Sequence, residues 1–201
     1  MEFLIIGAIG LIILLIVIAV AASRSGDPDD FTIEPPQRAV GRRGERAAER
    51  LIRSALREDD ALFTNVSVSY ENRRAELDDV IVNKFGVFVI EVKNYSGRLS
   101  GSEDEYEWTK IHISEGGNAY CKTVKNPIRQ VKREVYILAK YLDYYGVSVW
   151  VDGYAMILGA DSPVKSEYIL SNVSDIDRAI HTPGKQRLSA AVIDSVEKLL
   201  T

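Results

Sequence analysis

Two acidic residues and a lysine near the middle of the chain have the types and spacing of a hydrolytic site. Glu91 and Lys93 stand two residues apart at the end of an apolar run, and Asp78 precedes Glu91 by 13 residues. Carboxylate oxygens are ligands that suit Mg²⁺ or Mn²⁺, and such an ion can activate water. A lysine can then orient that water or stabilise developing negative charge. An ordinary salt bridge at a sheet edge is the alternative interpretation of Glu91 and Lys93.

The elements that must position these residues form a β-hairpin. Leu77–Val82 and Val87–Lys93 are rich in β-branched and aromatic residues, and Asn83–Gly86 supplies the turn. Side chains alternate across a strand, so Glu91 and Lys93 share one face. Alternation sends the doublet Asp78–Asp79 to opposite faces, so only one of the two can join Glu91. The other is expected to face solvent.

Two long helices flank this hairpin in the sequence. Gly41–Leu56 has apolar residues at helical spacing with arginines on the outer side. Glu45 in its first turn either meets the positive end of the helix dipole or points toward the two acids. The second helix begins after Asn126, a good N-cap before a proline, and ends before Gly146.

The remaining segments predict a mixed sheet flanked by helices. We expect strands at 61–70, 98–100, 108–113 and 119–124, a turn at 94–97, one bent strand over 147–158 that breaks at 152–153, and a short strand from 169. Helices are expected at 175–180 and 186–200. This order of elements predicts an α/β domain.

The N-terminus contains an uninterrupted apolar run without charge, Phe3–Ala22. Twenty helical residues span about 30 Å, the thickness of the hydrocarbon core of a bilayer. The run predicts an uncleaved membrane anchor, because it is long for a signal peptide and no Lys or Arg precedes it. Arg24 and Arg38 follow it, which favours a cytoplasmic C-terminal domain. A secretory signal peptide cleaved after Ala21 is the alternative.

The domain organisation follows from these breaks in composition. Residues 1–22 are expected to be the transmembrane anchor, residues 23–37, with three prolines, a linker, and residues 38–201 the folded domain. The single cysteine, Cys121, excludes an intramolecular disulfide and is expected to be a buried small hydrophobe. His112 and His181 stand apart, so no zinc cluster is visible in the sequence.

Charge is distributed unevenly along the chain. The net charge of −4 excludes a bulk polycation. Residues 38–57 carry seven Arg and two Glu, residues 121–145 carry six Lys or Arg and two acids, and residues 58–120 sum to −7. Two basic segments therefore flank an acidic centre, which indicates either phosphate contacts around a metal site or two solvated helix faces.

Over residues 38–160 the chain resembles the nuclease-related domain (NERD) family, a branch of the PD-(D/E)XK restriction-endonuclease-like superfamily. Four motifs carry the resemblance: Gly41-x-x-Gly44-Glu45, Glu76-Leu77-Asp78, Gly86-Val-Phe-Val-Ile-Glu91-Val-Lys93-Asn94-Tyr95-x-Gly97, and Asn126-Pro-Ile-Arg-Gln130. The last motif is one residue shorter than the family pattern Asn-Pro-x-x-x-Gln, and Leu77 replaces the proline of the superfamily name.

The resemblance implies a restriction-endonuclease-like sheet and a nuclease that acts on DNA with Mg²⁺ or Mn²⁺. It selects Asp78 over Asp79, and some family members carry a single membrane span. Its implied roles are metal binding for Asp78 and Glu91, catalysis for Lys93, a helix acid for Glu45, and a residue that faces the site from the second long helix for Gln130.

The expected protein is therefore a membrane-anchored, cytoplasm-facing domain that hydrolyses phosphodiester bonds of nucleic acid. A non-catalytic binding module at the membrane, which recruits nucleic acid or a protein partner, is one alternative. A secreted nuclease released after Ala21 is another.

Overall fold

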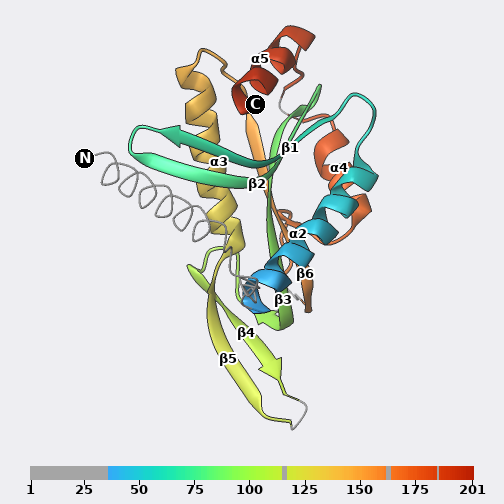
Figure 1. Ribbon diagram of the computed structural model, residues 1–201, viewed down its shortest axis with the longest axis vertical. Coiled ribbons are helices and arrows are strands. Elements are labelled where there is room, and N and C mark those ends of the chain that lie inside the picture. The colour runs from blue at the N-terminus through green and yellow to red at the C-terminus, as the bar shows by residue number, and fades with distance from the viewer. Residues whose placement is uncertain (1–35, 115–116, 162–163, 185) are drawn as a thin grey trace, which may run out of the picture. The chain divides into compact units, whose positions relative to one another are not determined.

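The hairpin that contains Glu91 lies at the centre of a mixed sheet of seven strands in the described part of the chain (Figure 1). The computed structural model describes residues 36–114, 117–161, 164–184 and 186–201. Within the first described helix, burial and side-chain contacts are described for Gly44 and from residue 46 onward. The predicted anchor Phe3–Ala22 lies outside these residues. None of the helices in the described ranges combines the length and apolar character needed to cross a bilayer.

The described elements alternate as the sequence predicts, and the α/β class with helices flanking a mixed sheet is confirmed. They are α2 (Pro36–Ala55), β1 (Ala61–Tyr70), β2 (Arg73–Asn83), β3 (Gly86–Ser100), β4 (Glu107–Ile113), β5 (Ala119–Lys125), α3 (Pro127–Tyr144), β6 (Val151–Asp161), β7 (Ile169–Leu170), α4 (Val173–His181) and α5 (Ala190–Leu200).

Strand β3 is the axis of the sheet because it pairs with three neighbours. Its first part runs antiparallel to β2, and its last residues run antiparallel to β4. On its other edge it pairs in parallel with β6, from Val87↔Val151 to Arg98↔Asp161. Strands β4 and β5 form a hairpin that extends away from the rest of the sheet (Figure 1).

The two faces of the sheet have separate cores. Val87 and Val89 of β3 pack in the cluster that contains the apolar stripes of α3 and α5. Phe88 and Ile90 pack in the cluster that contains α2 and α4. Complete burial of one aliphatic side chain contributes about 1.5–3 kcal/mol. Consecutive residues of β3 therefore stabilise opposite layers, which explains why the run is apolar at every position up to Glu91.

Three expected strand features are wrong. Residues 94–97 do not reverse the chain: β3 continues to Ser100, and a register shift between Asn94 and Gly97 absorbs the irregularity. The segment before Val151 is not strand, and β6 passes through residues 152–153 without a break. A Cβ at Gly153 would lie 3.0 Å from Val131 Cγ2 of α3. The glycine therefore allows α3 to lie against a continuous strand.

Helix ends and one burial prediction also differ from expectation. Helix α2 begins at Pro36, five residues before the predicted Gly41, and α5 begins at Ala190 after an N-cap at Ser189. Proline is favourable in the first turn because its missing N–H has no partner there. Cys121 is exposed rather than buried, since it lies on the extended β4–β5 hairpin.

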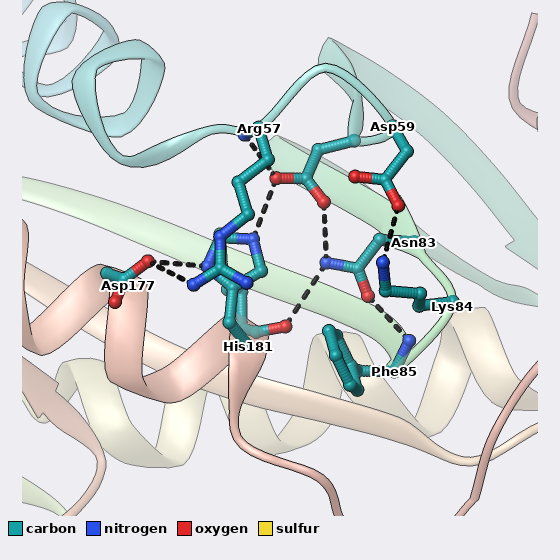
Figure 2. Close-up of polar contacts among 9 residues, drawn as sticks. Arg57, Asp59, Asn83, Lys84, Phe85, Asp177 and His181 are labelled. Atoms are coloured by element: carbon teal, nitrogen blue, oxygen red, sulfur yellow. Dashed lines mark hydrogen bonds and ion pairs between the residues drawn. The ribbon is translucent and has the colours of Figure 1, made fainter.

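A polar network holds the turn between β2 and β3 (Figure 2). Asn83, 1% exposed, donates from Nδ2 to Asp60 Oδ1 at 2.9 Å and to the Ile180 carbonyl at 3.1 Å. His181 lies between two carboxylates, with Nε2 2.8 Å from Asp60 Oδ2 and Nδ1 2.7 Å from Asp177 Oδ1. The turn is therefore fixed to the end of α4 and to the loop after α2. This is a structural role for a histidine that is isolated in the sequence.

Asn126 fixes the start of α3 to the loop before β4, and its predicted N-cap role is confirmed. Its Oδ1 accepts the Ile128 N–H at 2.9 Å, and its Nδ2 donates to the carbonyl oxygens of Glu103 at 2.9 Å and Glu105 at 2.7 Å. The side chain is 1% exposed. One buried amide thus sets the position of the helix that carries Gln130 one turn later.

Replacement Asn126→Ala should lower the free energy of unfolding by about 2–4 kcal/mol, because it removes a cap and the donor to the Glu103 and Glu105 carbonyls. Urea denaturation of the full chain measures this loss. The matched control is Asn172→Ala, which removes the exposed cap of α4 to Asp175 N–H and should cost about 1 kcal/mol. Equal losses in the two variants would contradict the role assigned to Asn126.

Candidate active site

Asp78, Glu91 and Lys93 meet where β2 and β3 separate. The pairing of these strands runs from Asn83↔Gly86 to Asp79↔Ile90. Just beyond it, Asp78 Oδ2 accepts the Val92 N–H at 2.8 Å, in place of a backbone partner. Lys93 Nζ forms an ion pair with Glu91 Oε1, in which the Glu91 side chain is 2% exposed and the Lys93 side chain 26%. The three residues are therefore close together, as the sequence leads us to expect.

Regular alternation does not hold at the acidic doublet of β2. The core beneath α3 contains Ala75 and Leu77, at odd-numbered positions, and also Val80 and Val82, at even-numbered positions. The alternation of side chains between the two faces of the sheet therefore shifts by one residue within Asp78–Asp79. Opposite this point β1 has Asn65 at φ +54°, between the pairs Thr64↔Asp79 and Val66↔Leu77. Both strands thus contain the same irregularity, and pairing resumes in register on either side of it.

This irregularity changes the expectation for Asp79. The prediction that Asp79 faces solvent is wrong, since the residue is 5% exposed. Asp78 and Asp79 both line a hollow of about 170 Å³, together with Val92 of β3 and Arg46 of α2. The selection of Asp78 as the metal-binding acid stays a prediction, because both acids of the doublet lie beside the same hollow.

Helix α3 adds Gln130 and a second buried glutamate to the site. Gln130 Nε2 donates to Glu91 Oε1 at 2.7 Å and to Glu134 Oε1 at 3.0 Å. Glu134 is 3% exposed. The other oxygens, Glu91 Oε2 and Glu134 Oε2, are buried without a hydrogen-bonding partner among the described residues. Because a buried unpaired carboxylate oxygen is costly, these atoms call for a proton or a cation.

Burial and repulsion shift the ionisation of the acids. Burial raises the pKa of Asp78, and burial together with the Asp78 charge raises the pKa of Glu91. Burial, followed by the Glu91 charge, raises the pKa of Glu134 to about 8. Glu134 therefore carries its proton at neutral pH and can donate a hydrogen bond to Glu91.

Lys93 keeps its positive charge in this setting. Burial lowers the pKa of Lys93, but the charge and hydrogen bond of Glu91 outweigh burial, and the net direction is upward. At neutral pH the ammonium group can donate hydrogen bonds and stabilise negative charge, and it cannot accept a proton.

The donor set fits the divalent metal that the family resemblance implies. Asp78 and Glu91 offer only oxygen atoms, and Glu91 Oε2 is a buried oxygen without a partner in the described chain. Among the described residues no group of three His, Cys, Asp or Glu side chains is arranged to hold an ion. Mg²⁺ ordinarily uses one or two carboxylates and keeps several waters, so two acids suffice.

The remaining predicted residue, Glu45, lies in α2, and its side chain falls outside the described part of the structure. The adjacent Gly44 is buried, and a Cβ at this position would overlap the side chain of Asn94. The glycine of the Gly-Glu motif thus allows α2 to lie against β3 immediately after Lys93.

Glu134 is the site residue that sequence reasoning missed. It stands four residues after Gln130, a spacing that places both on one face of a helix. That spacing was the available signal, but a glutamate in an amphipathic helix more often lies on the solvated face.

The sheet is mixed, and its central strand carries Glu-x-Lys beside the acid of a neighbouring strand, the arrangement expected of the restriction-endonuclease-like superfamily. The model of the nuclease-related domain matches residues 40–158, more than half of the chain, so the chain belongs to this nuclease-related domain (NERD) family. The predicted resemblance is confirmed.

One curated relative is an uncharacterized protein of Bacillus anthracis, 32% identical over 71 residues. The match covers 35% of this chain and 34% of that protein, about a third of each. No solved structure matches the chain.

The buried glutamates predict a pH dependence of stability in the metal-free protein. Between the ordinary value of 4.5 and about 8, the folded state holds the Glu134 proton that the unfolded state releases. The free energy of unfolding should therefore decrease as pH rises through this window. In EDTA, Glu134→Gln should have a smaller difference in Tm between pH 5 and pH 8 than the wild type. For a chain of this size, each kcal/mol of unfolding free energy shifts Tm by about 2–4 °C.

Thermal melts followed by circular dichroism measure this difference. The matched control Glu58→Gln changes an exposed loop carboxyl and should leave the difference as in the wild type. If Glu134→Gln keeps the full wild-type pH dependence, Glu134 does not hold the proton.

Proposed function

We propose that this protein hydrolyses phosphodiester bonds of nucleic acid with Mg²⁺ or Mn²⁺, and that DNA is its substrate. The observation that carries the proposal is the meeting of Asp78, Glu91 and Lys93 at the point where β2 and β3 separate. Membership of the nuclease-related domain family supports it.

In this proposal Asp78 and Glu91 hold the ion, which supplies charge neutralisation and a water of lowered pKa. Gln130 fixes the orientation of Glu91 through its 2.7 Å hydrogen bond. Lys93 remains an ammonium group and donates to the developing negative charge on the phosphate. The role that we propose for Lys93 is therefore electrostatic stabilisation.

Basic residues near the acids can bind the phosphate backbone. Arg46 of α2 lines the hollow that contains Asp78, and Arg129 and Arg133 of α3 line a second hollow beside Gln130. Arg129 and Arg133 provide local positive charge beside Gln130, which attracts a polyanion even though the whole chain has a net charge of −4.

Replacement Lys93→Ala or Glu91→Gln should reduce the rate of metal-dependent DNA cleavage by at least about a hundredfold. The first removes the cation that stabilises charge on the phosphate, and the second removes a carboxylate that would hold the ion. Gel assays of labelled DNA with Mg²⁺ or Mn²⁺ measure the rate. The control Lys84→Ala removes a lysine that pairs with Asp59 at the hairpin turn, and should cleave as the wild type does. Equal rates in Lys93→Ala and Lys84→Ala would exclude the catalytic role.

A non-catalytic binding module at the membrane is the second candidate. It is favoured by the partners that the acids already have: Val92 N–H for Asp78, and Lys93 and Gln130 for Glu91. Calorimetric titration with Mn²⁺ separates the two candidates. If the wild type binds nucleic acid but binds no more Mn²⁺ than the Asp78→Ala variant, the protein is a binding module and not a metal-dependent nuclease.

We also propose that Phe3–Ala22 anchors the chain in the cell membrane with the domain on the cytoplasmic side. The apolar length of this run and the arginines that follow it support the proposal. After alkaline carbonate extraction the protein should remain in the membrane pellet, and its N-terminal sequence should be intact. A soluble protein whose sequence begins at Ala22 would instead indicate a cleaved signal peptide.

A further inference from the structure

A second hollow opens at the base of the β4–β5 hairpin, against the first turns of α3. Its volume is about 550 Å³. Among the residues that line it are Tyr106, Lys125, Arg129, Gln130, Arg133 and Glu134. It thus combines an aromatic ring, three cations and two polar residues of the proposed active site.

The aromatic ring is Tyr106, which is 77% exposed. The Arg129 guanidinium carbon lies 3.8 Å from the centroid of this ring, and Arg129 Nη1 also donates to the Asp104 carbonyl at 3.4 Å. A large aromatic side chain with a cation on its ring face is a surface on which an unpaired nucleobase can stack. Stacking of this kind strengthens the binding of an unpaired base whatever the sequence.

The floor of the hollow connects directly to the proposed active site. Gln130 lines the hollow and donates to Glu91 at 2.7 Å. Glu134 also lines it, is 3% exposed, and has an oxygen without a hydrogen-bonding partner among the described residues. A nucleic-acid strand bound in this hollow would therefore have its backbone next to Gln130, the residue that donates to Glu91.

The charge of the hollow suits a phosphate backbone. Lys125, Arg129 and Arg133 contribute three positive charges, against the carboxyl groups of Glu107 and Glu134. Arg133 is held in place, because its Nη2 donates to the Arg74 carbonyl at 3.1 Å. Arginine and lysine side chains at fixed positions along a groove are the ordinary contacts of single-stranded nucleic acid.

We propose that the hollow between Tyr106 and Gln130 binds single-stranded nucleic acid, with an unpaired base on Tyr106 and phosphates on Lys125 and Arg133. The proposal rests on the nucleic-acid substrate proposed above and adds its strandedness. In a duplex the faces of the bases are covered by their neighbours, so a duplex gains only the charge contacts. A single strand gains the stacking contact as well.

The test is fluorescence anisotropy with the full-length protein in EDTA, where cleavage cannot interfere. The probes are labelled oligothymidine, oligouridine and a DNA duplex of equal length. Tyr106→Ala should weaken binding of the single strands about tenfold and binding of the duplex less than about twofold. Tyr106→Phe keeps the ring and should bind as the wild type does.

The matched control is Tyr144→Ala, because Tyr144 is 73% exposed at the other end of α3. This variant should bind all probes as the wild type does. Equal affinities of Tyr106→Ala and Tyr144→Ala for single strands would overturn the proposal, and so would an equal loss for duplex and single strand in Tyr106→Ala. The comparison of oligothymidine with oligouridine shows whether DNA or RNA is preferred, since the stacking contact is common to both.

The outcome is distinguishable from failure of the nuclease proposal. If the wild type cleaves DNA but Tyr106→Ala binds single strands normally, only the inference about this hollow is wrong. If Tyr106→Ala loses single-strand binding while the wild type shows no cleavage with Mg²⁺, the hollow stands as a binding site and the nuclease proposal fails. A wild type that binds no nucleic acid overturns both.

Discussion

The hydrogen bond from the Val92 N–H to the Asp78 carboxylate is the interaction on which the site depends. Strand β3 loses β2 as a neighbour after Ile90 and does not pair with β4 until Arg98. Along that interval one backbone edge of β3 has no neighbouring strand among those described, and a buried N–H there needs another partner. The Asp78 side chain supplies it. The same departure of β2 leaves Glu91 and Lys93 without a paired residue of β2 beside them.

Hydrogen bonds within the site offset part of the cost of burying its charged groups. Glu91 receives hydrogen bonds from Lys93 and Gln130, and Gln130 in turn contacts Glu134. Breaking a buried pair by removing one partner generally costs more than the pair contributes, since it leaves the other charge without compensation. The network is therefore coupled, and the effect of one substitution cannot be assigned to one residue.

Much of this arrangement could be predicted from the sequence because it is local. The apolar runs around Asn83–Gly86 fix the hairpin, Asn126 before Pro127 fixes the helix start, and strand periodicity puts Glu91 and Lys93 on one face. The parts that could not be predicted depend on residues far apart in the chain. The burial of Asp79 requires the matching irregularity of β1 at Asn65, and the setting of His181 requires Asp60, 121 residues earlier. No spacing within one segment contains that information.

The continuous pairing of β3 with β6 has a consequence for the motion of the site. The two strands pair in parallel from Val87 to Arg98, so Glu91 and Lys93 lie on the strand with the most extensive pairing among those described. Regions with dense buried pairing open only when much of the domain unfolds. Glu91 and Lys93 are therefore expected to lie on the part of the protein that fluctuates least. Most residues of the β4–β5 hairpin are exposed, so a change in its conformation on binding of a nucleic-acid strand would disrupt few buried contacts.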